Sequence, residues 1–154
     1  MVKPRVAIIG AGSSGLAALK QCLDDDLDPI CFEQTSCVGG LWNFVEVDDD
    51  ENKDPHPSAY KSLVINSSKE VVYNFKLRPY IKFRTTVVRV SYLPDHRWKV
   101  KYATSVNKDQ TSEHEEIFDF VMVCNGHHRK QRWPKYKGMD EFKGEQTHSH
   151  FYRR

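Results

Sequence analysis

The stretch from Arg5 to Cys22, "RVAIIGAGSSGLAALKQC", constrains the fold of this chain more than any other. Residues 5–9 are a short, largely apolar run rich in β-branched side chains, which predicts a strand buried on both faces. A helix is predicted to begin at Ser13 or Ser14 and to run to about Leu23. The residues "PICFE" (29–33) then predict a second strand, so the chain opens with a β-α-β unit.

Three glycines at the strand-to-helix turn, Gly10, Gly12 and Gly15, match the pattern GxGxxG. In a dinucleotide site the first glycine permits the tight turn, the second lets the backbone approach a pyrophosphate, and the third lets the helix pack on the strand. The phosphates then meet amide groups at the positive end of the helix dipole. An ordinary glycine turn is the alternative interpretation.

Glu33 follows at the end of the second predicted strand, 18 residues after Gly15. A carboxylate at this position can accept hydrogen bonds from an adenosine ribose and repels a 2′-phosphate. The motif therefore predicts FAD or NAD(H) as its ligand and not NADP(H). The alternative is an exposed glutamate at a sheet edge.

Size and composition predict one globular domain. The chain has 154 residues, of which 39% are hydrophobic and 29% charged, and its formal net charge of +2 does not by itself indicate a nucleic-acid binder. We see neither a signal peptide nor a membrane-spanning run. The four cysteines have no paired spacing and predict reduced thiols in a cytoplasmic protein.

The rest of the chain divides into three parts. Residues 34–68 predict a long functional loop region. The runs "IKFRTTVVRV", "RWKVKYA" and "EEIFDFVMVC" predict three strands of an antiparallel meander, joined by turn-like "LPDH" and polar "TSVNKDQTSEHE". The second part of the last run, from Asp119 to Cys124, is expected to return to the parallel sheet. The tail after it is expected to be mostly loop.

Four ordered motifs now resemble the flavin-containing monooxygenases. Residues 10–44 combine the glycine loop and its acid with "CVGGLWNF", and "LVINSSKE" (63–70) is similar to the family's flavin-facing segment. "FDFVMVCNGHH" (118–128) is similar to the strand and turn that complete its FAD domain. The pattern FxGxxxHxxxY, the family's identifying sequence, is matched by Phe142, Gly144, His148 and Tyr152.

The resemblance implies an α/β fold over residues 1–154, a Rossmann-like FAD-binding domain with a parallel sheet and an antiparallel three-stranded meander. It implies that the pyrophosphate of FAD lies at the glycine loop, the ribose at Glu33, and the ribityl and flavin region near residues 40–42. Asn66 is expected to hydrogen-bond near the reactive flavin, although asparagine and serine here also suit a turn or helix cap. The residues carried over are Gly10, Gly12, Ser13, Gly15, Glu33, Gly40, Leu41, Trp42 and Asn66.

The activity that the resemblance implies is oxygenation of small soft nucleophiles, amines or sulfides, by NADPH and O₂. In this family NADPH reduces the flavin, O₂ adds at C4a, and the hydroperoxide transfers oxygen to nitrogen or sulfur. Tyr152 favours this branch over the Baeyer–Villiger enzymes, which usually have tryptophan there. Full-length members are expected at the endoplasmic reticulum membrane.

Three family features are not found in the sequence. The second GxGxxG, for NADP, and the C-terminal apolar segment are absent, and "VVYNFKLRPY" (71–80) replaces a Phe- and Pro-rich stretch and a helix. The missing helix is expected to uncover apolar surface, with weak FAD retention and marginal stability. A second hypothesis is therefore an inactive truncated flavin-binding or interaction module, which pairs with a longer family member. A third is a fragment of an NAD-dependent dehydrogenase.

The tail concentrates histidine and basic residues, but we expect it to bind neither metal nor nucleic acid. His127 and His128 lie at a predicted strand end, and His148 belongs to the identifying sequence. A metal site needs converging ligands, and a nucleic-acid site needs a docking motif. Solvated loop charge is the simpler interpretation.

Overall fold

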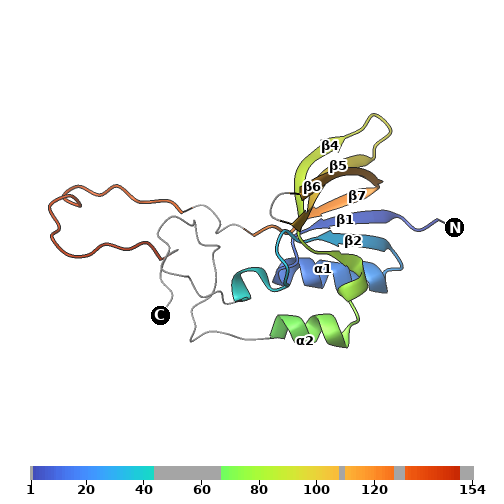
Figure 1. Ribbon diagram of the computed structural model, residues 1–154, viewed down its shortest axis with the longest axis horizontal. Coiled ribbons are helices and arrows are strands. Elements are labelled where there is room, and N and C mark those ends of the chain that lie inside the picture. The colour runs from blue at the N-terminus through green and yellow to red at the C-terminus, as the bar shows by residue number, and fades with distance from the viewer. Residues whose placement is uncertain (1, 44–66, 108–109, 127–130, 150–154) are drawn as a thin grey trace.

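The computed structural model describes residues 2–43, 67–107, 110–126 and 131–149 (Figure 1). The elements in chain order are β1 (Arg5–Ile9), α1 (Ser13–Asp24), β2 (Asp28–Phe32), the 3₁₀ turn η1 (Gly40–Trp42), α2 (Ser67–Asn74), the 3₁₀ turn η3 (Arg78–Tyr80), β3 (Ile81–Lys82), β4 (Thr85–Tyr92), β5 (Trp98–Asn107), β6 (Gln110–Phe118) and β7 (Phe120–Val123).

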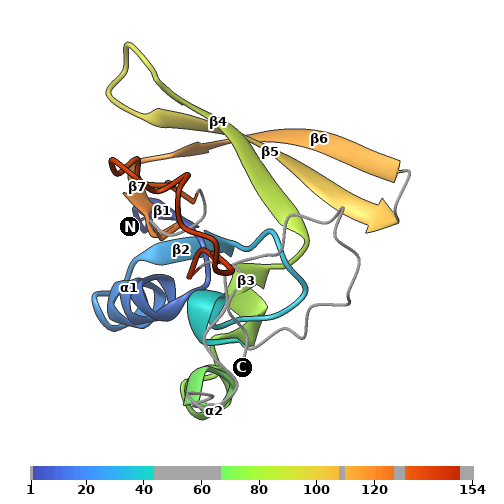
Figure 2. The same cartoon turned by 90° about the vertical axis from the view of Figure 1, so that its left-hand side faces the viewer.

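A four-stranded parallel sheet has the order β3-β2-β1-β7. In it β1 is central, and Ile8 lies opposite Cys31 of β2 and Met122 of β7. The helix α1 connects β1 to β2, so the predicted β-α-β unit is confirmed. Figure 2 shows α1 and α2 on one side of this sheet and the strands β4, β5 and β6 on the other.

The core lies on both faces of the parallel sheet, because β1 alternates its buried side chains between them. Ile8 packs with Leu16 and Leu19 on the helical side, in a cluster that also includes Cys31 and Leu77. On the opposite face Ala7 packs with Phe32, Val100, Tyr102 and Phe118. The prediction of a first strand buried on both faces is therefore confirmed.

The antiparallel meander β4-β5-β6 is also confirmed, but two predicted strands are divided. The run 81–90 breaks at Phe83–Arg84, where Arg84 has φ +51°, so β3 joins the parallel sheet and only β4 joins the meander. The run 115–124 breaks at Asp119 into β6 and β7, and β7 lies beside β1 in the parallel sheet, which confirms the expected return of residues 119–124 to that sheet. Asp119 is fixed there by Arg5, whose backbone N–H donates to Oδ2 at 2.7 Å and whose carbonyl accepts from Asp119 N at 3.0 Å.

The prediction that "TSVNKDQTSEHE" (104–115) connects two strands was wrong. Residues 104–107 and 110–115 are strand, because β5 continues to Asn107 and β6 begins at Gln110. Lys101 and Glu113 pair across the ribbon at 2.7 Å, and Lys99 and Glu115 pair at 3.4 Å. Since residues 111–115 are exposed, they carry no apolar alternation that would reveal a strand.

A polar cluster joins the meander to the parallel sheet. Glu116 of β6 accepts hydrogen bonds from Arg5 of β1 at 2.6 Å, Lys82 of β3 at 2.6 Å and the Tyr102 hydroxyl of β5 at 2.5 Å. Burial opposes ionisation of Glu116, but the hydrogen bonds from Lys82, Tyr102 and Arg5 outweigh it and lower its pKa to about 2. The Arg5 guanidinium also lies 4.6 Å from the Phe118 ring centroid.

Residues 131–149 of the tail form an extended arm that projects away from the two sheets (Figure 1). They contain neither helix nor strand, as predicted for this part of the tail. Among the described helices, none has both the length and the apolar character needed to cross a membrane.

Candidate functional site

The glycine loop lies at the carboxyl end of the parallel sheet, where β1 turns into α1. Gly10 has φ +101°, and a Cβ there would lie 2.7 Å from the Cys124 carbonyl oxygen at the end of β7. A Cβ on Gly15 would lie 1.8 Å from the carbonyl oxygen of Gly10. The protein's own packing therefore requires glycine at the first and third positions of the motif.

Gly12 is different, because none of the described residues excludes a side chain there. Its φ of −74° suits any residue, and a Cβ would meet only the Gly40 Cα at 3.8 Å. The packing of the described residues therefore leaves room for a side chain beside the first turn of α1, yet the position is glycine. This is the arrangement expected where a ligand approaches the backbone closely.

The N-terminus of α1 is open. Gly12 is the N-cap without a side-chain cap, and no acidic residue lies in the first turn. The first intrahelical hydrogen bond runs from Leu16 N to Gly12 O at 2.9 Å, so the amides of Ser13, Ser14 and Gly15 precede it. Both serine side chains are exposed. These amides and the helix dipole suit an anionic group at this position.

Glu33 directly follows β2 and lies beside this loop. Its side chain is buried, with an exposed fraction of 7%, so the alternative of an exposed glutamate at a sheet edge was wrong. One carboxylate oxygen, Oε2, accepts a hydrogen bond from Ala11 N at 2.8 Å. The other, Oε1, accepts from both the backbone N–H and the hydroxyl of Thr35, each at 2.8 Å.

A second glycine turn completes the site. Gly39 N donates to the Ala11 carbonyl at 2.9 Å, and Gly39 forms an isolated parallel bridge with Gly12. A Cβ on Gly40 would lie 3.2 Å from the Gly12 Cα, so the two glycine turns approach backbone to backbone. Leu41 and Trp42 follow with exposed fractions of 37% and 42%.

The structure thus brings most of the predicted site residues together. The three loop glycines, Ser13, Glu33 and Gly40 surround one end of the sheet, and Leu41 and Trp42 extend from it. Asn66 lies outside the described residues. The sequence analysis missed Ala11 and Thr35 as partners of Glu33, although a threonine two residues after a buried acid is a signal for a local side-chain bond.

The cysteines near the site carry free thiols. Cys31 lies under the loop, with Sγ 3.5 Å from the Gly10 carbonyl, and burial raises its pKa to about 12. Burial also raises the pKa of Cys124. These thiols therefore stay protonated and serve as core packing, whereas nucleophilic chemistry needs a thiolate.

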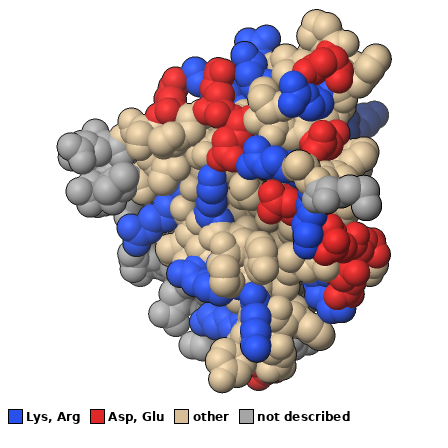
Figure 3. Space-filling view, turned by 90° about the vertical axis from the view of Figure 1, so that its right-hand side faces the viewer, with Lys and Arg blue, Asp and Glu red and all other residues tan. Residues whose placement is uncertain are grey.

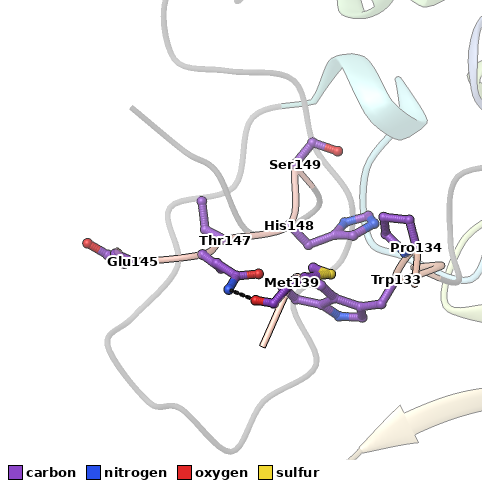
Figure 4. Close-up of a pocket in the computed structure, with 8 residues that line it drawn as sticks. Trp133, Pro134, Met139, Glu145, Thr147, His148 and Ser149 are labelled. Carbon is purple, nitrogen blue, oxygen red and sulfur yellow. Dashed lines mark hydrogen bonds between the residues drawn. The ribbon is translucent and has the colours of Figure 1, made fainter. Parts of the chain in front are cut away.

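A separate hollow of about 550 Å³ lies within the tail arm (Figure 4). Trp133 and His148 face each other across 5.3 Å between ring centroids, and Gln146 Nε2 donates to Met139 O at 3.1 Å. The hollow is lined by Trp133, Pro134, Met139, Glu145, Gln146, Thr147, His148 and Ser149. Its described lining residues all belong to the tail, and none of them is part of the glycine turns.

The tail also explains part of the identifying sequence. The Phe142 ring lies over Gly144, where a Cβ would come within 2.5 Å of the ring. Phenylalanine two residues before glycine is therefore a packing requirement of the arm. His148 borders the hollow, and Tyr152 lies outside the described residues.

Charges on the face shown in Figure 3 are mixed, with basic and acidic side chains interspersed. Lys3 with Asp26 and Arg97 with Asp95 are ion pairs of this kind. Across the described parts of the chain, no three His, Cys, Asp or Glu residues are grouped so that they could hold a metal ion.

Comparison with known proteins gives consistent matches. The sequence profile described as flavin-binding monooxygenase-like matches residues 3–74 and 72–154. Flavin-containing monooxygenase 5 of Cavia porcellus is 35% identical over 188 residues, which include 99% of this chain and 33% of that protein. The N-oxide-forming dimethylaniline monooxygenase 2 of Rattus norvegicus is 37% identical over 187 residues, with the same two coverages.

Among solved structures, S-allyl-L-cysteine S-oxygenase from Allium sativum matches with a TM-score of 0.83 and 26% identity. The match covers 99% of this chain and 43% of that one. The chain therefore spans about a third of the length of the curated relatives that it matches.

The comparisons also locate a difference from the relatives. The alignment with the guinea-pig protein covers 188 positions, more than the 154 residues of this chain, so the relative has residues that this chain lacks. The two segments of the family match meet at residues 72–74, within α2. This agrees with the expected loss of a stretch after "NSSKE". Tyr73 and Phe75 are exposed at the junction, with fractions of 83% and 52%.

Proposed function

This chain belongs to the flavin-binding monooxygenase-like family, and we propose that it binds FAD at the carboxyl end of its parallel sheet. The observation that carries this proposal is the contrast among the loop glycines. Packing requires Gly10 and Gly15, whereas the described residues admit a side chain at Gly12, where a Cβ would make an ordinary contact with the Gly40 Cα at 3.8 Å. A diphosphate that approaches the backbone closely is a reason for glycine at that position.

Each residue of the site has a proposed role. The amides beside Gly12 and Ser13 hold the pyrophosphate at the open end of α1, and Glu33 accepts a hydrogen bond from the adenosine ribose. Residues 40–42 line the ribityl and flavin region, for which Leu41 and Trp42 offer exposed apolar surface. Asn66 is proposed, from the family resemblance, to lie near the reactive part of the flavin.

The reaction that we propose for the whole protein is oxygenation of an amine or sulfide. When bound, the flavin passes two electrons from NADPH to O₂, so that one oxygen atom reaches the substrate and the other leaves as water. The names of two relatives, one N-oxide-forming and one an S-oxygenase, support nitrogen and sulfur as acceptors. This chain contributes the binding and orientation of FAD.

An alternative is a flavin-binding or interaction module without turnover, which associates with a longer family member. The interruption of the family match at residues 72–74 and the exposed aromatic side chains there favour it. Consumption of NADPH by the purified chain with an amine or sulfide, together with the oxygenated product, would decide for the enzyme. A cytoplasmic location for this chain and a reticulum-membrane location for full-length relatives remain predictions.

The experiment is a titration of the purified chain with FAD, followed by absorbance and protein fluorescence. Gly12→Ala is expected to keep the fold, because its backbone conformation and surroundings admit a methyl group, but to weaken FAD binding at least about tenfold. Urea denaturation of Gly12→Ala beside the wild type is the control, because an unchanged free energy of unfolding shows that the fold accepts the added methyl group. A wild-type chain that binds no FAD, or a Gly12→Ala variant that binds it normally, would contradict the proposal.

A further inference from the structure

Glu33 has one acceptor position left for a ligand. An ionised carboxylate offers about four lone-pair positions, and three are used by Ala11 N, Thr35 N and the Thr35 hydroxyl. The Thr35 bonds both fall on Oε1, whereas Oε2 accepts only from the glycine loop within the described residues. Oε2 is therefore the oxygen that can accept a further donor.

Thr35 decides which oxygen this is. The backbone N–H and the hydroxyl of Thr35 both donate to Oε1 and hold it on the side of residue 35. The other oxygen, Oε2, therefore points to the glycine loop. A hydroxyl that donates to an ionised carboxylate makes a charge-assisted bond, which is stronger than the usual threonine bond within a turn. Without it, the glutamate side chain regains rotational freedom that ligand binding must then remove.

The same hydroxyl reaches the second glycine turn. Its one proton is donated to Glu33, so toward the turn Thr35 Oγ1 acts as an acceptor, from Cys37 N–H at 3.4 Å; the Cys37 carbonyl oxygen, 2.8 Å from Oγ1, is the alternative acceptor of that proton. Two residues later, Gly39 N donates to the Ala11 carbonyl at 2.9 Å, and Ala11 N donates to Glu33. The contacts therefore close a ring through Ala11, Glu33, Thr35, Cys37 and Gly39. This ring joins the glycine loop, the end of β2 and the turn that carries Gly40.

We propose that Thr35 is a positioning residue for FAD. Its hydroxyl orients the Glu33 carboxylate so that Oε2 meets a ribose hydroxyl, and it sets the Gly39–Gly40 turn against the glycine loop. The inference rests on the proposed binding of FAD at this site. Thr35 does not touch the ligand itself, so its effect must pass through Glu33 and through the turn.

The test is a double-mutant cycle on FAD affinity with Thr35→Val, Glu33→Gln and the double variant. Thr35→Val keeps the shape of the side chain and removes the hydroxyl, and it is expected to weaken FAD binding about tenfold. In the Glu33→Gln background the same change is expected to cost less than about threefold, because coupled residues are not additive. Thr35→Ser keeps a hydroxyl and is expected to stay within about threefold of the wild type.

The controls separate positioning from general loss of structure. Thr86→Val makes the same chemical change on the exposed face of β4 and is expected to leave FAD affinity unchanged. Melting of each FAD-free variant is measured by circular dichroism; if Thr35→Val does not fold, Thr35→Ala replaces it. A folded variant without the hydroxyl that binds FAD like the wild type overturns the inference, as does an equal loss in both backgrounds. A wild type that binds no FAD refutes the proposed function instead.

Discussion

Glu33 and Glu116 each connect segments that are distant in the sequence, but they do so with different partners. Glu33 accepts hydrogen bonds from neutral donors, namely two backbone amides and a hydroxyl. Glu116 is held by two cations, Arg5 and Lys82, together with the Tyr102 hydroxyl. One carboxylate lies at the end of the parallel sheet, and the other lies between the two sheets.

The difference distinguishes an acid that can serve a ligand from an acid that serves the fold. No cation compensates Glu33 among its described partners, and one of its acceptor positions is unused. Glu116 has its charge balanced within the protein, so its contribution is to stability and depends on pH. Each acid should therefore fail in a different assay.

The largest effect is expected at the glycine loop, from Gly15→Ala. A Cβ at 1.8 Å from the Gly10 carbonyl oxygen cannot be accommodated without moving α1 away from β1. We expect a loss of stability above about 4 kcal/mol, enough to unfold the chain. Urea denaturation followed by circular dichroism measures it. A variant within about 1 kcal/mol of the wild type would show that the loop is not packed as described.

Glu116→Gln is expected to lower stability by roughly 3 kcal/mol, because it removes the carboxylate that pairs with Lys82 and leaves Arg5 with only the more distant Asp28, at 3.6 Å, among its described ion pairs. FAD affinity of the folded variant should not change. Glu115→Gln is the matched control, since Glu115 pairs with Lys99 on the exposed ribbon and is half exposed. Denaturation and FAD titration of both variants provide the comparison. A loss of FAD affinity in folded Glu116→Gln would remove the distinction between the two acids.

The pH dependence of stability sharpens the same point. The pKa of Glu116 is lower in the folded chain, about 2, than in the unfolded chain, 4.5, so its stabilisation is complete above pH 4.5 and is lost as the pH falls toward 2. By this linkage the wild type should lose roughly 2 kcal/mol through this group between pH 6 and pH 3. Melting across this range should show the loss in the wild type and a smaller loss in Glu116→Gln. Parallel curves for the two proteins would refute the assignment.

Glu33→Gln is expected to change FAD affinity more than it changes stability. The amide has one oxygen where the carboxylate has two, so one set of protein donors loses its acceptor; FAD binding should weaken about tenfold, and stability should fall by about 1–2 kcal/mol. Isothermal titration with FAD and urea denaturation measure the two quantities. A stability loss as large as that of Glu116→Gln, with unchanged FAD affinity, would make Glu33 a structural acid.

The smallest effect is expected on the meander surface. Glu113→Gln removes the ion pair with Lys101, and exposed pairs of this kind contribute less than about 0.5 kcal/mol. Urea denaturation at low and high salt should detect little change in either condition. A larger loss would mean that the charged ribbon contributes to the stability that we assign to Glu116.

How much the sequence predicted depends on what kind of interaction defines each region. The glycine loop and its helix were predicted closely, because Gly10 and Gly15 satisfy steric limits that few other arrangements require. The ends of the meander strands were not, because exposed pairs such as Lys101 and Glu113 leave no apolar pattern. The role of Thr35 was also missed, since a hydrogen bond between side chains has no period in the sequence.

The position of Asp119 limits how the lengths of the strands in the two sheets can change during evolution. Asp119 is the one residue between β6 and β7. Its backbone N–H donates to the Arg5 carbonyl, and its carboxylate accepts a hydrogen bond from the Arg5 backbone N–H. Successive side chains of a strand point to opposite faces, so this one residue fixes the phase of β7 relative to that of the meander. The hairpins can lengthen at their tips without disturbing that phase. An insertion or deletion at Asp119, by contrast, would exchange the inward-facing and outward-facing side chains of β7 relative to those of β6. A change in the length of this connection therefore has to be matched by changes in both sheets.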